Sequence, residues 1–171
     1  MKKIVIAHHS GYAHTRRQAE AVLAGAQSVA GAEAQLLDVT AIDDAGWAQL
    51  AAADAIVFGA PTYMGSLSAP FKAFMDASSK VWFTQGWKDK LAAGFTCSAS
   101  QSGDKLNSLL QLSVFAAQQA MVWVSLGLMP GNNSTTGSTA DLNRLGSYLG
   151  AMAQANADQA FAVGEDDAAF D

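Results

Sequence analysis

The sequence predicts an α/β protein in which helices cover both faces of a five-stranded parallel β-sheet. Short apolar runs alternate along the chain with longer segments whose apolar residues recur at helical spacing. A parallel strand needs a long connection to return to the same edge of a sheet, and each helical segment supplies one such crossover. The apolar runs place the strands at residues 3–7, 35–39, 55–59, 92–96 and 121–124.

The first strand, residues 3–7, leads through His8 and His9 into a turn that contains a glycine and hydroxyl groups. The helix expected next, residues 15–30, has alanine, valine and leucine on one face. The first N–H groups of a helix are unpaired and carry the positive end of its dipole. The turn of residues 10–15 is therefore predicted to hold a phosphate.

The third strand, residues 55–59, is followed by a Pro-Thr-Tyr-Met-Gly loop at residues 61–65. The helix after it, residues 70–78, carries proline in its first turn, which is a favourable position for proline. A loop of this kind presents backbone amides around a flat surface. We therefore expect it to lie along a flat aromatic cofactor.

The fourth strand, residues 92–96, is followed by residues 97–103, where small and hydroxyl-bearing residues surround one amide, Gln101. Such groups can line a polyol and the polar edge of a ring without filling a cleft. Loops thus leave the carboxyl ends of the first, third and fourth strands. In open parallel sheets, ligands bind beyond these ends, so the three loops should converge on one site.

Three further helices are expected, at residues 46–53, 104–120 and 141–156. The first loop lacks both the G-x-G-x-x-G of dinucleotide-binding folds and the lysine of a P-loop, which favours the strand order 2-1-3-4-5. The apolar stripes of the last two helices consist of Leu106, Leu109, Leu110 and Val114, and of Leu142, Leu145, Leu149 and Met152.

The composition limits the classes of partner. With 171 residues, 50% of them hydrophobic, the chain suits one domain, expected at residues 1–163 and followed by an acidic tail at 164–171. The net charge of −5 disfavours binding to nucleic acid or to an anionic membrane, and no segment approaches the length of a membrane span. One cysteine, Cys97, forms no intramolecular disulfide, and a cytoplasmic location is expected.

No metal site is expected. His8 and His9 have no carboxylate neighbour at metal-ligand spacing, and we interpret both as structural. Cys97 begins a loop between a strand and a helix, but residues 97–105 contain no arginine to clamp an oxyanion, so we interpret it as a buried thiol rather than a phosphatase nucleophile.

The motifs at residues 10–15, 59–65, 68–70 and 71–76 together resemble the flavodoxin superfamily. The branch they resemble most is the tryptophan-repressor-binding-protein-like group of NAD(P)H:quinone oxidoreductases, with the related NADPH-dependent FMN reductases. The resemblance extends through Trp82 and residues 95–103 to the start of the fifth strand, which is most of the chain. It implies the flavodoxin-like doubly wound fold and a bound FMN.

The resemblance also implies roles for individual residues. The FMN-binding residues would be Ser10, Gly11, Tyr12, Ala13, His14 and Thr15 around the phosphate, Pro61, Thr62, Tyr63, Met64 and Gly65 along the ring, and Ser98, Ala99, Ser100, Gln101 and Gly103 near the ribityl chain and the pyrimidine edge. Trp82 and Gln118 would border the substrate. The chain has Gln118 and Gln119 where the quinone reductases carry paired histidines, and an amide cannot donate a proton as an imidazole can.

The function implied is an oxidoreductase that passes electrons from NAD(P)H through FMN to a quinone or another small acceptor. The flavin supplies the chemistry, so no catalytic acid or base is expected. The resemblance also allows a homodimer, formed through the alanine-rich faces of the helices. A non-enzymatic flavodoxin that carries electrons between protein partners is the alternative, and a module that binds FMN only weakly for a regulatory role is a third possibility.

Overall fold

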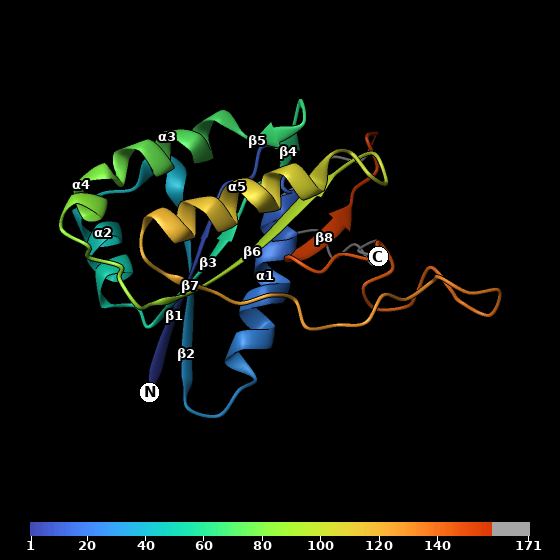
Figure 1. Ribbon diagram of the computed structural model, residues 1–171, viewed down its shortest axis with the longest axis horizontal. Helices are drawn as coiled ribbons and strands as arrows, with labels where there is room; N and C mark the ends of the chain where they lie inside the picture. The colour runs from blue at the N-terminus through green and yellow to red at the C-terminus, as the bar shows by residue number, and fades with distance from the viewer. Residues whose placement is uncertain (159–171) are drawn as a thin grey trace.

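The computed structural model describes residues 1–158, and a parallel β-sheet forms its centre (Figure 1). The sheet consists of β1 (Lys2–His8), β2 (Ala32–Asp38), β3 (Ala55–Gly59), β6 (Leu91–Ser98), β7 (Val122–Trp123) and β8 (Ala151–Gln154). Its order is β2-β1-β3-β6, and β7 and β8 share the next place beside β6. The predicted fold class and the order 2-1-3-4-5 are confirmed.

The fifth place in the sheet is divided between two short strands. β7 pairs with the start of β6, where Leu91 faces Val122, and β8 pairs with its end, where Phe95 faces Ala151. Between the two strands the chain leaves the sheet in a long excursion, seen in orange at the right of Figure 1. The predicted strand at residues 121–124 accounts only for the first of these two pieces.

The helix predicted at residues 141–156 is wrong. Asn143 and Gly146 have positive φ angles of 52° and 69°, which no α-helix accommodates, and turns lead from them into β8. At Gly150 a Cβ would collide with the carbonyl oxygen of Gly94, so only glycine allows the chain to enter the sheet there. The helically spaced leucines are overridden by this turn chemistry, and Leu142 is 77% exposed.

Four of the predicted helices are present with shifted ends. The helices are α1 (His14–Gln27), α2 (Asp44–Ala52), α3 (Ala69–Ala77), α4 (Ser79–Phe83) and α5 (Lys105–Gln118), with a 3-10 turn, η1 (Val39–Ala41). Asp43 caps α2 by accepting a hydrogen bond from the backbone N–H of Gly46 at 2.9 Å. Neither α4 nor the two-stranded hairpin of β4 (Thr62–Tyr63) and β5 (Ser66–Leu67) was predicted.

The helices cover the sheet on both sides and create two cores. α1 covers one face, where Ala19 packs with Ile6 and Phe95. Residues of α2, α3 and α5 pack on the other face. An aromatic cluster fills this second core, with ring centroids 5.3–6.4 Å apart, and it consists of Phe58, Phe71, Phe74, Trp87 and Phe115. Burial of each such side chain contributes about 1.5–3 kcal/mol to folding.

The predicted apolar stripe of α5 is only partly buried. Leu109 belongs to the core, but Leu106, Leu110 and Val114 are 53%, 44% and 59% exposed. These three residues recur every four positions and lie on the outer side of the helix, because the sheet contacts the side that carries Leu109, Leu112 and Phe115. The helix therefore has two apolar faces, of which the fold buries one.

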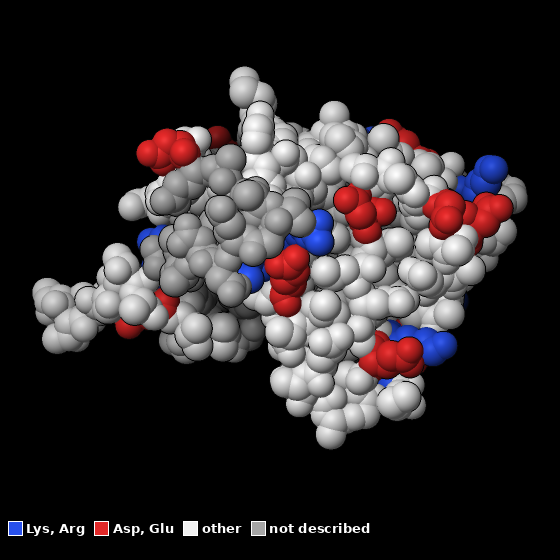
Figure 2. Space-filling model, turned by 180° about the vertical axis from the view of Figure 1, so that it is seen from behind, with Lys and Arg blue, Asp and Glu red and all other residues white. Residues whose placement is uncertain are grey.

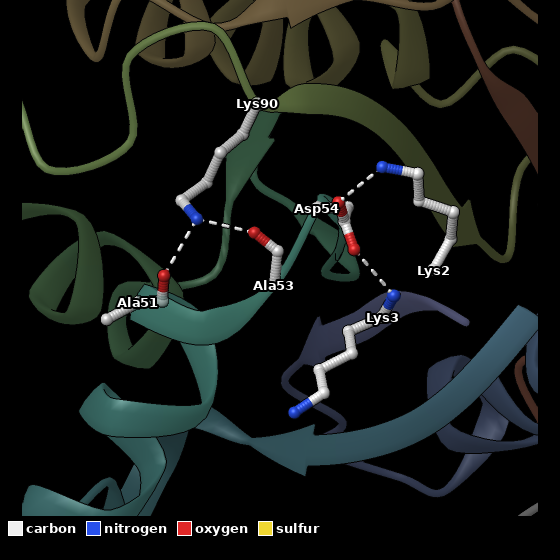
Figure 3. Close-up of polar contacts among 6 residues, drawn as sticks. All are labelled: Lys2, Lys3, Ala51, Ala53, Asp54 and Lys90. Carbon is white, nitrogen blue, oxygen red and sulfur yellow. Dashed lines mark hydrogen bonds and ion pairs between the residues drawn. The ribbon is translucent and has the colours of Figure 1, made fainter.

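Polar contacts stabilise the amino-terminal ends of the strands, on the side of the sheet away from the predicted loops (Figure 3). The ammonium group of Lys90 donates hydrogen bonds to the carbonyl oxygens of Ala51 and Ala53, which end α2. Asp54 accepts from Lys2 Nζ and from the backbone N–H of Lys3, each at 2.8 Å. Lys90 thus acts as a C-terminal cap of α2 at the start of β6. Among the helices described, none is long and apolar enough to cross a membrane.

Candidate functional site

A cavity of about 690 Å³ lies beyond the carboxyl ends of β1, β3 and β6. All three of the predicted loops contribute to its wall, and the predicted residues that line it are Tyr12, His14, Thr15, Pro61, Thr62, Tyr63, Met64, Gly65, Ser98, Ala99, Ser100 and Gly103. This volume falls within the range of about 300–1,000 Å³ that small-molecule sites occupy. The loops are brought together because parallel strands end at one edge of the sheet.

Not every predicted site residue borders the cavity. Ser10, Gly11, Ala13 and Gln101 belong to the same loops but do not line it. The two residues expected to border a substrate, Trp82 and Gln118, are also absent from the wall. Gln118 ends α5, about 20 Å along the helix from the loop where α5 begins.

One part of the wall escaped prediction. Residues 155–158, which follow β8, line the cavity together with Cys97. Ala155 is held there because its N–H donates to the carbonyl oxygen of Ser98 at 3.1 Å. Recognition of residues 151–154 as a strand parallel to β6 would have placed this fourth segment at the same edge.

The first loop offers an uncapped helix start and a buried hydroxyl. α1 begins after Ala13, which has a φ of 66° and no side chain that can cap the helix. Ser10 Oγ is buried and has no hydrogen-bond partner among the described residues. Thr15, at the end of the same loop, is also buried, with Oγ1 3.2 Å from Cys97 Sγ. A buried hydroxyl without a partner is costly, and an anionic ligand oxygen would satisfy it.

The second loop is the tip of the β4–β5 hairpin, where Met64 and Gly65 have φ angles of 50° and 76°. The side chain of Met64 is fully exposed at the mouth of the cavity. Asn107 of α5 donates from Nδ2 to the carbonyl oxygen of Gly65 at 2.6 Å. This bond fixes the hairpin tip against α5.

A buried network of hydroxyl groups fixes the base of the same hairpin. Thr62 Oγ1 lies 2.8 Å from Thr96 Oγ1 of β6 and 2.7 Å from Ser108 Oγ of α5. Thr96 Oγ1 in turn donates to the carbonyl oxygen of Ala60 at 2.6 Å. All three hydroxyl residues are at most 6% exposed. The wall formed by the hairpin is therefore tied both to the sheet and to a helix.

Tyr63 connects the second loop to the first. Its hydroxyl lies so close to Gly11 that a Cβ there would collide with it, and its ring meets Tyr12 edge-on at 6.3 Å between centroids. Burial raises the pKa of Tyr63, and a backbone hydrogen bond with Gly11 opposes this shift. A side chain at position 11 would therefore have to displace the Tyr63 hydroxyl.

The third loop is wrapped around the ammonium group of Lys105. Lys105 Nζ donates to Ser98 Oγ and to the carbonyl oxygen of Ser100, both at 2.6 Å. A Cβ at Gly103 would collide with Ser98 Oγ, so glycine leaves the room that this arrangement needs. Lys105 is completely buried, and this burial lowers the pKa of its ammonium group.

The two histidines after β1 are buried, and His9 makes a structural contact. His9 Nδ1 lies 2.8 Å from Ser68 Oγ, which joins the end of β1 to the start of α3. Burial lowers the pKa of His8 and of His9, and the carboxylate of Asp38 partly offsets it. Within residues 1–158, no group of three or more histidine, cysteine or acidic residues is arranged to hold a metal ion.

These features suit a planar ligand that carries a phosphate. The start of α1, which has no side-chain cap, and the partnerless hydroxyl of Ser10 lie at the first loop, a rigid hairpin forms one wall, and small residues of the third loop leave space at the far end. Hydroxyls and amides line most of the wall, and the one carboxylate on its described part, Asp158, comes from the segment after β8 and from none of the three loops. An anion is therefore favoured at the first loop.

Comparison with known proteins agrees with this geometry. The model of the family described as NADPH-dependent FMN reductase matches residues 4–135. The chain is 46% identical over 161 residues to flavodoxin FldP of Pseudomonas aeruginosa, covering 92% of this chain and 84% of that protein. It is 34% identical over 145 residues to an NAD(P)H dehydrogenase (quinone) of Geotalea uraniireducens, covering 72% and 71%. The structure of a flavodoxin, WrbA-like protein from Agrobacterium tumefaciens superposes with a TM-score of 0.71 at 47% identity, covering 85% of this chain and 90% of that one.

Proposed function

We propose, from the premise that this chain belongs to the NADPH-dependent FMN reductase family, that it binds FMN in the cavity and passes electrons from NAD(P)H to a quinone or another small acceptor. The observation that carries the proposal is the match to the family over residues 4–135, which contain the three loops that meet at the cavity. The geometry and the family thus point to the same edge of the sheet.

The residues present fit FMN in three parts. The partnerless hydroxyl of Ser10 and the open N-terminus of α1 would hold the phosphate, with Gly11, Tyr12, Ala13, His14 and Thr15 completing the loop. The hairpin loop 61–65 would lie along the ring. The third loop, with Ser98, Ala99, Ser100, Gln101 and Gly103, would contact the ribityl chain and the pyrimidine edge. Each assignment is supported by the position of its loop at the cavity.

Bound FMN supplies the electron transfer between nicotinamide and acceptor, and the chain supplies its orientation. The hydroxyl network of Thr62, Thr96 and Ser108 holds the hairpin in place beneath the ring position. Met64, fully exposed at the rim, leaves the mouth of the cavity open toward solvent on that side. An acceptor can therefore approach one side of the ring position, while the protein covers the other.

The acceptor is proposed to be a small molecule, because several relatives are NAD(P)H dehydrogenases (quinone). Within one chain, however, neither glutamine of the pair at 118–119 contributes to the cavity. Gln119 donates from Nε2 to Ser78 Oγ at 2.8 Å in a buried contact, so its role is structural. Gln118 is exposed at the end of α5. We propose no proton transfer by either residue.

The alternative is a flavodoxin that carries electrons between proteins, favoured by the 46% identity to a protein named flavodoxin. Anaerobic mixing of the FMN-loaded protein with NADH or NADPH, followed by menadione, separates the two functions. A reductase bleaches the flavin absorbance with the nicotinamide and regains it with menadione in repeated turnovers. Failure of both nicotinamides to reduce the bound flavin, with accumulation of one-electron-reduced flavin on photoreduction, would refute the reductase.

We also propose that the chain forms a homodimer through the outer face of α5. This face carries the exposed Leu106, Leu110 and Val114, and the helix has no charged side chain on its exposed surface. Exposed apolar surface without charge is typical of the centre of a protein interface. In a chain with a net charge of −5, it is also a face along which two copies approach without like-charge repulsion.

Nucleic acid and membrane surfaces are not proposed as partners. On the described part of the face shown in Figure 2, acidic and basic side chains are scattered, and the basic ones form no continuous patch. We propose a cytoplasmic location, which the buried free thiol of Cys97 and the use of NAD(P)H support.

A further inference from the structure

Lys105 places a buried positive charge directly behind the cavity wall. Its side chain is completely buried, and Nζ donates at 2.6 Å to Ser98 Oγ and to the carbonyl oxygen of Ser100. Both of these serines line the cavity. Among residues 1–158, no carboxylate forms an ion pair with Lys105; of the other side chains that act on its charge, Cys97 favours it and the cationic Arg144 opposes it.

A lysine in this situation needs an explanation. A buried ammonium group is costly unless an anion compensates it, and a hydroxyl and a carbonyl oxygen are neutral acceptors. Lys90 shows the more usual arrangement for a lysine that caps carbonyl groups, because part of its side chain stays at the surface, with Asp54 close enough to favour its charge. Lys105 instead directs its charge toward the space that the ligand would fill.

The distance allows this charge to act on a ligand. A ligand atom that accepts the proton of Ser98 Oγ, in place of the Ser100 carbonyl oxygen that accepts it in the structure, lies two hydrogen bonds from Nζ, which is about 6 Å at most. At that separation, with an effective dielectric constant of about 20, a unit negative charge on the ligand would be favoured by up to about a hundredfold in binding.

We propose that Lys105 is a positioning residue that fixes the third loop and makes the cavity bind two-electron-reduced FMN in preference to oxidised FMN. FMN that takes up two electrons and one proton, as NAD(P)H supplies them, gains one negative charge, and the pyrimidine edge carries it. A cation near this edge stabilises the reduced form and raises the midpoint potential. This inference rests on the proposed function and on the placement of the pyrimidine edge at the third loop.

Three variants separate the charge of Lys105 from its structural contacts. Lys105→Met removes the charge with a side chain of similar length, Lys105→Gln removes it but keeps a hydrogen-bond donor, and Lys105→Arg keeps it. Replacement of an unpaired buried charge by an apolar group is often tolerated. Lys90→Met is the matched control, because it removes an equal charge from the other end of β6, about 23 Å away along the strand.

The measurements are the dissociation constant of oxidised FMN, from quenching of its fluorescence, and the midpoint potential of the bound FMN at pH 7. We expect Lys105→Met and Lys105→Gln to weaken the binding of reduced FMN about tenfold more than that of oxidised FMN. This corresponds to a potential about 30 mV lower than in the wild-type protein. Lys105→Arg should restore most of the difference, and Lys90→Met should leave the potential unchanged.

The outcomes distinguish this inference from the proposed function. A wild-type protein that binds no FMN would overturn the proposed function, and this inference with it. A wild-type protein that binds FMN, with an unchanged potential in both neutral variants, would overturn the inference alone, even if oxidised FMN binds more weakly. Should Lys105→Met fail to fold, the potential of Lys105→Gln decides the question.

Discussion

Replacement of Thr62 by valine tests whether buried hydroxyl groups hold the hairpin at the cavity. The direction of each hydrogen bond in this network follows from counting protons. Thr96 Oγ1 donates its single proton to the carbonyl oxygen of Ala60, so it must accept from Thr62 Oγ1. Thr62 has then used its own proton, and Ser108 Oγ must be the donor in the third bond, at 2.7 Å. The chain of bonds runs from Ser108 through Thr62 and Thr96 to Ala60.

The magnitude follows from this order. Valine has nearly the same shape as threonine, so Thr62→Val removes two hydrogen bonds, each contributing about 0.5–1.5 kcal/mol, without creating a large cavity. It also leaves the donor of Ser108, a completely buried residue, without an acceptor, which costs about 1–3 kcal/mol. We expect a loss of about 2–6 kcal/mol in the free energy of unfolding, together with weaker binding of FMN because the hairpin wall loosens.

Urea denaturation of four proteins measures this effect: wild type, Thr62→Val, Ser108→Ala and the double variant. Ser108→Ala removes the hydroxyl that has no acceptor in Thr62→Val. The double variant should therefore lose about 1–2 kcal/mol less unfolding free energy than the sum of the losses in the two single variants. Additive losses, or a Thr62→Val protein within about 0.5 kcal/mol of the wild type, would refute the assigned directions.

Further predictions concern the cofactor, the dimer and pH. Ser10→Ala should weaken FMN binding about tenfold or more in fluorescence titration, yet leave the unfolding free energy of the FMN-free protein unchanged, because Ser10 Oγ bonds no described residue. Leu110→Glu should convert the dimer to monomer in sedimentation velocity, whereas Val29→Glu, at a residue 59% exposed after α1, should not. Burial lowers the pKa of His8 and His9, so the unfolded chain binds protons that the folded one rejects. The free energy of unfolding is therefore highest above the unfolded-state pKa of about 6.5. Urea denaturation at about pH 5.5 should give a value lower by at most about 1.4 kcal/mol per histidine, and an equal urea midpoint at both pH values would contradict this.

The sheet and the three loops were predictable because local signals agree with the fold at those places. The run at residues 55–59 is apolar along its length and the run at residues 92–96 is apolar except for Thr96, as expected of strands buried on both faces, and both are flanked by small residues. Once the strands are parallel, the loops that follow them must share an edge. The site therefore follows from the strand pattern and needs no knowledge of side-chain positions.

Other parts of the molecule depend on contacts between distant residues, which a pattern along the chain does not reveal. Leucines at 142, 145 and 149 have helical spacing, but the glycines at 146 and 150 and the pairing of β8 with β6 decide the structure. The stripe on α5 shows the same limit, since spacing identifies an apolar face without telling whether the fold covers it. Nothing in the sequence indicates that Tyr63 approaches Gly11, because the contact joins two loops.

The divided fifth strand has a consequence for specificity. The match to the family ends at residue 135, whereas the segment that follows β8, residues 155–158, forms part of the cavity wall. The three loops within the matched region carry the features that bind FMN. The segment after β8 lies outside that region, and the hydrogen bond from Ala155 N–H to the Ser98 carbonyl oxygen holds it against the third loop. The same serine accepts a hydrogen bond from Lys105. Selectivity for the acceptor and the redox state of the cofactor are therefore expected to be set at this corner of the cavity, where β6, β8 and α5 meet, rather than at the phosphate loop.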